Sequence, residues 1–235
     1  MRGNQLLASL PTEAASALQK HLIRVRLNAG QRLICAGDWV ETVHFPIDCQ
    51  LANIVEMPDG SPAETSFVGA EGCSGLAPVL ADRDSPWSVV VRVPGEAWVI
   101  RTEQLSAAVE ESPELLQRLL VLTLFYQAQS AQYTACNMHH TVLQRLARVL
   151  LTSTDVSPEV PLRFSQEELA LVVGNQRSTV NQAAQHLKSA GAIAYRRGHI
   201  EIVDRGRLEA RACPCYKILR DHAERERLLP PRQTD

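Results

Sequence analysis

The segment Ser165–Gly191 limits most strongly what this chain can fold into, because its sequence predicts two helices joined by a tight turn. Ser165 and Glu168 have the spacing of a capping box, in which each side chain accepts a backbone N–H at the start of a helix. Gly174 suits the end of that helix because it adopts positive φ without a Cβ clash. The second helix ends at Gly191, and its predicted buried side comprises Val180, Ala183, Ala184 and Leu187.

The spacing across the turn is typical of a helix-turn-helix, which needs a small residue, a turn glycine and a β-branched anchor. Ala170, Gly174 and Val180 occupy these positions. The solvent side of the second helix is rich in groups that recognise base edges: arginine pairs with guanine, and asparagine or glutamine with adenine. A helical hairpin with a solvated polar face is the alternative. The predicted DNA contacts from this segment are Gln176, Arg177, Ser178, Thr179, Asn181, Gln182 and Gln185.

A predicted hairpin follows directly. Two short alternating runs, Ile193–Tyr195 and Ile200–Ile202, flank a basic loop that contains a glycine. A hairpin in this position is typical of the wing of a winged helix, which would place Arg196 and Arg197 near DNA phosphates. A surface hairpin without such a role is the alternative.

The charge distribution favours nucleic acid as the partner of this region. The 235 residues have a net charge of −2, but residues 161–235 contain 13 Lys and Arg against 9 Asp and Glu, which gives +4. Residues 1–160 contain 11 against 17, which gives −6. The positive charge therefore accompanies the helix-turn-helix, as attraction to phosphates requires. We find no apolar run that could span a bilayer and no export signal, so we expect a cytoplasmic protein without a membrane partner.

The first half of the chain has a different pattern. After a short amphipathic helix within residues 5–22, residues 23–100 consist of brief alternating runs separated by turn signals. Turns at intervals of about eight to twelve residues are typical of an antiparallel barrel or sandwich. Such a barrel either encloses a ligand or is filled by its own side chains, and the pattern allows both.

A long helix is predicted from Ser112, with Pro113 and Glu114 in its first turn. Its near-heptad stripe predicts a dimer interface that would hold two recognition helices about 34 Å apart on DNA. Burial of the stripe against its own domain is the alternative. The predicted interface residues are Leu115, Leu119, Leu122, Tyr126, Gln129 and Tyr133.

These segments predict an α+β protein with three parts. Residues 1–111 form an antiparallel β-domain with a sensor role, residues 112–137 the dimerisation helix, and residues 138–235 the winged helix-turn-helix. A further helix over residues 142–151 and a proline-containing link over 155–161 precede the motif. The charged run of residues 220–227 predicts a solvated helix or a frayed tail.

The arrangement resembles the cyclic-AMP receptor protein/fumarate–nitrate regulator (CRP/FNR) family of bacterial transcription factors. The likeness is strongest over residues 144–215, in QRLARVLL, FSQEELALVVG and RRGHIEI, and the glycines at 30, 37 and 69–75 match turn positions of the β-domain. It implies a jelly-roll domain of the cyclic-nucleotide-binding type, a homodimer, double-stranded DNA with a two-fold-related site, and RNA polymerase as a partner. It also implies that bases are read by Arg177, Ser178 and Gln182.

The sequence departs from the resemblance where cyclic AMP would bind. Family members hold the nucleotide with a Gly-Glu pair and an Arg-Ser pair, but this chain has Leu76 and Asp84 in place of the acid and the arginine. A buried phosphate without a counter-charge is poorly held, so we expect no tight binding of cyclic AMP and leave the effector unknown. A cyclic-nucleotide-responsive regulator is the alternative. The candidate effector-pocket residues are Gly75, Leu76, Ser85, Trp87 and Ser130.

Cysteines raise a second alternative, a regulator that senses redox state through its thiols. Six are present, and the closest pair is Cys213-Pro214-Cys215. That pair lacks the CxxC spacing of a zinc knuckle, and His139 and His140 are adjacent, so we expect no metal and no cofactor. An enzyme is a remote alternative because the sequence has no GxSxG, HExxH or Walker motif.

Overall fold

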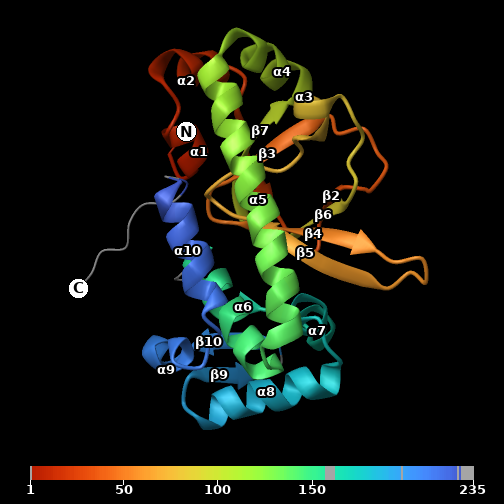
Figure 1. Ribbon diagram of the computed structural model, residues 1–235, viewed down its shortest axis with the longest axis vertical. Coiled ribbons are helices and arrows are strands. Elements are labelled where there is room, and N and C mark those ends of the chain that lie inside the picture. The colour runs from red at the N-terminus through yellow and green to blue at the C-terminus, as the bar shows by residue number, and fades with distance from the viewer. Residues whose placement is uncertain (1, 157–161, 197, 227, 229–235) are drawn as a thin grey trace.

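The computed structural model describes residues 2–156, 162–196, 198–226 and 228, and it shows a β-domain, a long helix and a C-terminal helical domain (Figure 1). Seven strands form the β-domain: β1 Ile23–Leu27, β2 Arg32–Ile34, β3 Thr42–Pro46, β4 Gln50–Glu56, β5 Pro62–Val68, β6 Ser88–Val93 and β7 Gly95–Arg101. They pair antiparallel in two sheets, ordered β1-β7-β3 and β2-β6-β4-β5. The predicted α+β class with an N-terminal antiparallel β-domain is confirmed.

The core of the β-domain consists of small and branched apolar side chains from both sheets. Residues such as Leu27, Leu51, Val68, Val91 and Ala97 are almost fully buried in one cluster. This burial follows from the alternating pattern of the strands, which directs every second side chain inward. Four short helices belong to the same part of the chain: α1 Gln5–Ala8, α2 Thr12–Gln19, α3 Ala77–Ala81 and α4 Thr102–Glu111.

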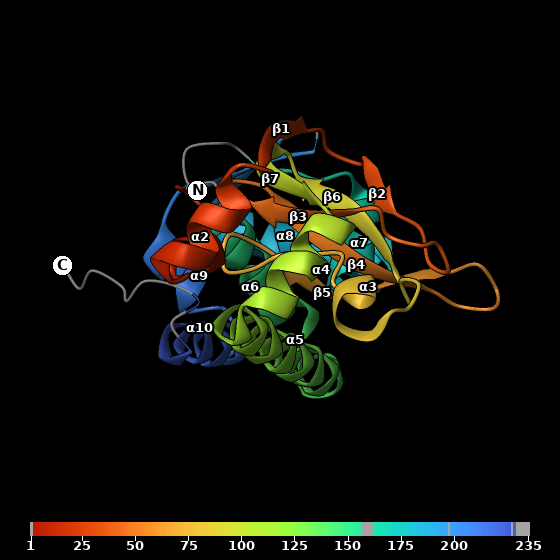
Figure 2. The same ribbon diagram turned by 90° about the horizontal axis from the view of Figure 1, so that it is seen from above.

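The long helix α5, Pro113–His139, runs along the outside of the β-domain (Figures 1 and 2). Ser112 caps it, since its hydroxyl accepts the backbone N–H of Leu115 at 3.2 Å. One face of α5 packs on the β-domain and on the N-terminal helices, where Leu119 and Leu122 are completely buried.

The predicted dimer residues lie on that inward face, which corrects our expectation. Within a single chain Leu115, Leu119, Leu122, Gln129 and Tyr133 are all buried. Tyr126 is half-buried, and its hydroxyl donates to the carbonyl of Cys73 at 3.2 Å. The stripe therefore packs against its own chain, which was the alternative interpretation, whereas Leu116, Leu120 and Leu124 of α5 are exposed.

The C-terminal domain begins with α6, Val142–Val156, and builds the predicted winged helix around it. Its elements are β8 Leu162–Arg163, α7 Gln166–Val173, α8 Arg177–Ser189, β9 Ile193–Arg196, β10 His199–Ile202 and α9 Arg205–Glu209. The strands form a small antiparallel sheet in the order β8-β10-β9. Leu146, Leu150, Phe164, Leu169 and Leu187 contribute to a shared apolar core.

The last helix, α10 (Cys215–Arg225), lies beside α5 and does not form a freely solvated tail (Figure 1). Ala223 is buried, and the ring of His222 meets that of Phe125 edge-on at 5.4 Å. Arg220 is partly buried and pairs with Asp155 of α6 at 3.5 Å. The expected helix is therefore present over most of the described part of that run, but one side of it packs on the molecule instead of being solvated; Arg227 lies outside the described residues.

Polar contacts join the β-domain to the winged helix. The guanidinium of Arg92 on β6 binds Glu64 on β5 at 2.8 Å and lies 3.5 Å from Glu168 on α7. Ser153 of α6 donates to the side chain of Gln50 at 3.2 Å. Among the described helices, none is both long and apolar enough to cross a membrane.

Candidate nucleic-acid interface

Helix α7 is fixed at both ends by the signals that the sequence shows. The Ser165 hydroxyl accepts the N–H of Glu168 at 3.1 Å, and the Glu168 carboxylate accepts the N–H of Ser165 at 2.8 Å, so the capping box is confirmed. Gly174 ends the helix at φ +67°. The N–H of Asn175 donates to the carbonyl of Ala170 at 3.0 Å, which closes the turn before α8.

Helix α8 is buried on one side and open on the other. Val180, Ala183, Ala184 and Leu187 are buried as predicted and hold the helix on the domain core. The other side lies at the end of the molecule away from the β-domain (Figure 1). Gln176, Arg177, Ser178, Gln182 and Gln185 are exposed there, and Thr179 and Asn181 are half-buried.

Arg177, the first residue of α8, forms an ion pair with Glu167 of α7 at 2.5 Å. Both side chains are more than half exposed. An exposed pair of this kind contributes only about 0–1 kcal/mol, so the guanidinium is free to exchange this partner for a stronger one. A bidentate contact to guanine is such a partner.

The wing is present as the predicted hairpin, with Gly198 at φ +82° in its turn. The carbonyl of Gly198 accepts the N–H of Phe164 at 2.9 Å, which ties the wing to the strand before α7. Arg196 is exposed at the end of β9. Arg197, the second predicted phosphate contact, lies outside the described residues.

The candidate effector residues do not form a site with a charged group that could bind a phosphate. Gly75 has φ +100°, and an added Cβ would lie 3.0 Å from the carbonyl oxygen of Thr42, so the close turn requires glycine. Leu76 is half-buried against an apolar cluster. Ser85 is buried, and its hydroxyl donates to the carbonyl of Trp87 at 2.7 Å, so it serves its own loop. The Trp87 side chain is exposed, and Ser130 is half-buried on α5.

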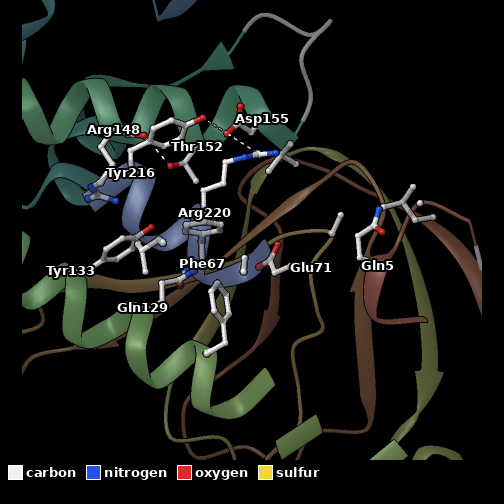
Figure 3. Close-up of a pocket in the computed structure, with 17 residues that line it drawn as sticks. Gln5, Phe67, Glu71, Gln129, Tyr133, Arg148, Thr152, Asp155, Tyr216 and Arg220 are labelled. Atoms are coloured by element: carbon white, nitrogen blue, oxygen red, sulfur yellow. Dashed lines mark hydrogen bonds and ion pairs between the residues drawn. The ribbon is translucent and has the colours of Figure 1, made fainter. Parts of the chain in front are cut away.

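A cavity of about 310 Å³ lies elsewhere, between the β-domain, α5, α6 and α10 (Figure 3). Its wall includes charged and aromatic side chains: Phe67, Glu71, Tyr133, Arg148, Asp155, Tyr216 and Arg220. None of the five candidate effector residues lines it. Sequence reasoning missed the cavity because its wall combines residues from both ends of the chain with residues from its middle.

Specific contacts fix the polar part of this wall. Asp155 accepts the hydroxyl of Tyr216 at 2.6 Å and pairs with Arg205 at 2.7 Å. The guanidinium of Arg148 lies 4.1 Å from the centre of the Tyr133 ring, a cation–π distance. Burial raises the pKa of Glu71, whose carboxylate accepts the N–H of Gly69 at 2.8 Å.

Four further residues meet at the C-terminal end of α5. The ligand atoms of Cys136, His140, Cys213 and Cys215 all lie within 4.8 Å of one another. The hydrogen bond from Cys213 is the main reason that the pKa of Cys136 falls to about 4. The expectation that the chain has no metal-ligand constellation therefore needs correction. One signal was present in the sequence, because Cys136 and His140 are four residues apart, the spacing that places two side chains on one side of a helix and its cap.

Two family models match the chain. A Crp-like helix-turn-helix domain matches residues 144–211, and a cyclic nucleotide-binding domain matches residues 24–112. Fold and motif thus define a class of transcription regulator in which a winged helix is joined to a β-domain of the nucleotide-binding type. Among curated proteins, no sequence matches the chain.

Solved structures of the same class are similar over most of the chain. FixK2 from Bradyrhizobium japonicum is 14% identical, with a TM-score of 0.68 over 82% of this chain and 98% of its own. CLP from Xanthomonas campestris, described as a c-di-GMP-responsive global regulator, is 19% identical, with a TM-score of 0.64 over 83% and 100%. A Silicibacter pomeroyi regulatory protein named as cAMP-binding is 25% identical, with a TM-score of 0.63 over 89% and 94%. The chain belongs to the CRP/FNR family of transcription factors.

Proposed function

We propose that this protein is a homodimeric transcription regulator that binds a two-fold-related DNA site in a sequence-specific manner. The single observation that carries the proposal is helix α8, which presents a continuous polar face to solvent while its other face is buried. RNA polymerase is the proposed protein partner, on the strength of the family alone.

The residues on α8 and the wing have different proposed roles. Arg177, Ser178 and Gln182 read base edges in the major groove, because they are exposed on the first two turns of α8. Gln176, Thr179, Asn181 and Gln185 lie beside them and complete the contact surface. Arg196 and Arg197 bind phosphates from the wing and supply affinity without sequence preference.

The dimer forms through the outward face of α5. This face carries Leu116, Leu120, Leu124 and Met138, whose exposed fractions run from 37% to 75% in the single chain. Their spacing of about four residues aligns the three leucines along one side of the helix. Exposed apolar side chains that line up in this way mark a protein contact, and a second copy of α5 provides a matching stripe.

The proposed signal is a small molecule other than cyclic AMP, and its proposed site is the 310 Å³ cavity. The cavity contacts the β-domain, α5, α6 and α10, so a ligand there would shift the balance between placements of the two recognition helices. Arginines and carboxylates both line it, which suits a polar or zwitterionic ligand better than a nucleotide phosphate.

DNA binding is tested by footprinting on symmetric promoter fragments against random competitor DNA at several salt concentrations. We expect a protected site with two halves about one helical turn apart and a preference of at least about a thousandfold over random DNA. Equal affinity for both would favour a non-specific architectural protein and contradict the proposal.

The signal is tested by a thermal-shift screen that includes cyclic AMP, cyclic di-GMP, small acids, amino acids and redox reagents. A ligand of the cavity raises the melting temperature of the native protein but not of Ala70→Trp, a variant that fills the cavity from the loop beside Gln5. The matched control is Asp84→Arg. It changes the position where family members hold the nucleotide phosphate with an arginine, and it leaves the cavity intact. If cyclic AMP raises the melting temperature of both the native protein and Ala70→Trp, the ligand does not bind in the cavity. The nucleotide site that the family resemblance implies, around Leu76 and Asp84, would then be the effector site.

A further inference from the structure

We propose that Cys136, His140, Cys213 and Cys215 form a tetrahedral Zn²⁺ site that fastens the end of α5 to the beginning of α10. Cys136 lies in the last turn of α5, and His140 is the residue that caps it. Cys213 and Cys215 flank Pro214 at the start of α10. Three thiolates and one imidazole are a common ligand set of structural zinc.

The interatomic distances match such a site. A tetrahedral zinc with Zn–S bonds of about 2.3 Å and a Zn–N bond of about 2.0 Å separates its ligand atoms by about 3.5–3.8 Å. The Sγ atoms of Cys136 and Cys213 are 3.5 Å apart, and Nδ1 of His140 lies 3.5 Å from Sγ of Cys215. All four ligand atoms fall within 4.8 Å, so the longest separation needs to contract by only about 1 Å.

Charge at the site also favours a metal with thiolate ligands. Arg145 and Arg148 are both buried, and the charges of both act on Cys136 and Cys213. Within the part of the chain that the structure describes, the Nε–H groups of both arginines lack a hydrogen-bond acceptor. One Zn²⁺ with three thiolates and a neutral histidine has a net charge of −1, which partly balances these buried cations.

A second layer of contacts orients the ligands. The side-chain amide of Gln132 donates to Sγ of Cys215 at 3.0 Å. The N–H of Cys213 donates to the carbonyl of Gln144 at 3.4 Å, and that of His140 to the carbonyl of Cys136 at 3.0 Å. The Gln132 contact stabilises the Cys215 thiolate, and the two backbone bonds fix the positions of Cys213 and His140, as contacts around established metal sites do.

The position of the site gives it a structural role. Helix α6, the first element of the winged-helix domain, begins at Val142, only two residues after His140. A zinc ion here would fix the junction between α5, α6 and α10, and its binding would release the protons of the coordinating thiols. A disulfide between Cys136 and Cys213 and a mononuclear iron are rival states of the same cluster, and the experiment below separates them.

The first test is elemental analysis of the full-length protein, purified under reducing conditions and dialysed against metal-free buffer. We expect about one zinc per chain. X-ray absorption at the zinc edge should give three sulfur neighbours at about 2.3 Å and one nitrogen at about 2.0 Å. Cobalt exchanged into the native protein should give the visible bands of tetrahedral thiolate coordination.

Variants assign the ligands. Cys136→Ser and Cys215→Ser should each reduce zinc to about a tenth of an atom per chain or less, because each removes one ligand. Cys35→Ser, which changes an exposed cysteine of the β-domain, is the matched control and should retain the metal. Protein with stoichiometric iron, with a Cys136–Cys213 disulfide, or without zinc and unable to take up cobalt would overturn the proposal. The native-protein measurements decide the matter even if a variant does not fold.

Discussion

Helices α5 and α8 each bury one apolar face, but the sequence predicted the surroundings of only one of them. For α8 the buried anchors and the exposed polar face are where the sequence placed them. For α5 the apolar stripe that was assigned to a partner chain is packed on the chain's own β-domain. The difference lies in the second face of each helix: it is polar on α8, whereas on α5 it carries further leucines.

The comparison shows that periodicity identifies a buried face without identifying what buries it. A helix with one apolar face has one solution, which is to place that face on the nearest core. A helix with two apolar faces has to divide them between its own domain and a partner, and local sequence contains no information about the division. Predictions follow for the two faces of α5, for the polar face of α8 and for the contact between α7 and the β-domain.

The largest effect is expected on the outward face of α5. The double variant Leu120→Glu and Leu124→Glu places charges in the proposed dimer interface, so we expect a monomer and about 10²–10⁴-fold weaker binding to a two-half-site operator, because bivalent binding is lost. Analytical ultracentrifugation and a DNA-binding titration measure both quantities.

The matched control is Ile23→Glu with Met57→Glu, which adds the same charges to exposed apolar residues of the β-domain. It should remain dimeric with native affinity. A dimeric Leu120→Glu and Leu124→Glu variant would exclude this face as the interface.

Substitutions on the inward face of α5 should lower the stability of the protein. Leu119 is fully buried, so Leu119→Ala should lower the free energy of unfolding by about 2–5 kcal/mol through lost contacts and a cavity. Leu120→Ala, one residue away and 44% exposed, should cost much less in the separated chain. Denaturant unfolding at low protein concentration compares the two, and equal losses would contradict the assignment of the faces.

Much of the fold could be predicted because its signals are local. The capping box at Ser165, the glycine at 174 and the proline after Ser112 each determine a helix end through neighbouring atoms. The cavity around Arg148 and the thiol cluster could not be predicted in this way. Cys136 and Cys213 are 77 residues apart and meet only because α10 returns along α5, which no local pattern encodes.

Substitutions on the polar face of α8 should change the sequence specificity of DNA binding. Arg177→Ala should weaken binding to the operator by about 1–3 kcal/mol and relax the preference at one base pair, because a bidentate contact to guanine is lost. Binding titrations on operators with single base changes measure this effect. Glu167→Gln removes the competing ion-pair partner at 2.5 Å and should leave the preference intact with equal or tighter binding. Equal losses for Arg177→Ala on every DNA sequence would reassign this residue to phosphate contact.

The smallest effect is expected where α7 meets the β-domain. Glu168 has two roles: one carboxylate oxygen accepts the N–H of Ser165, and the other lies 3.5 Å from Arg92. Glutamine preserves the first role, because a capping box accepts either residue, and removes only the charge. Glu168→Gln should therefore cost at most about 1 kcal/mol in unfolding free energy, whereas Glu168→Ala also loses the cap and should cost about 0.5–2 kcal/mol more.

The Glu168→Gln variant also distinguishes whether the contact between Glu168 and Arg92 only stabilises the protein or also regulates DNA binding. If the contact with Arg92 holds the winged helix on the β-domain in a placement unsuited to DNA, Glu168→Gln should bind the operator more tightly, by up to about fivefold for 1 kcal/mol. Unchanged affinity together with a lower melting temperature would assign the contact to stability alone. Arg92 also binds Glu64 at 2.8 Å inside the β-domain, and this ion pair is kept in Glu168→Gln. A change in operator affinity or melting temperature would therefore come from the contact between α7 and the β-domain.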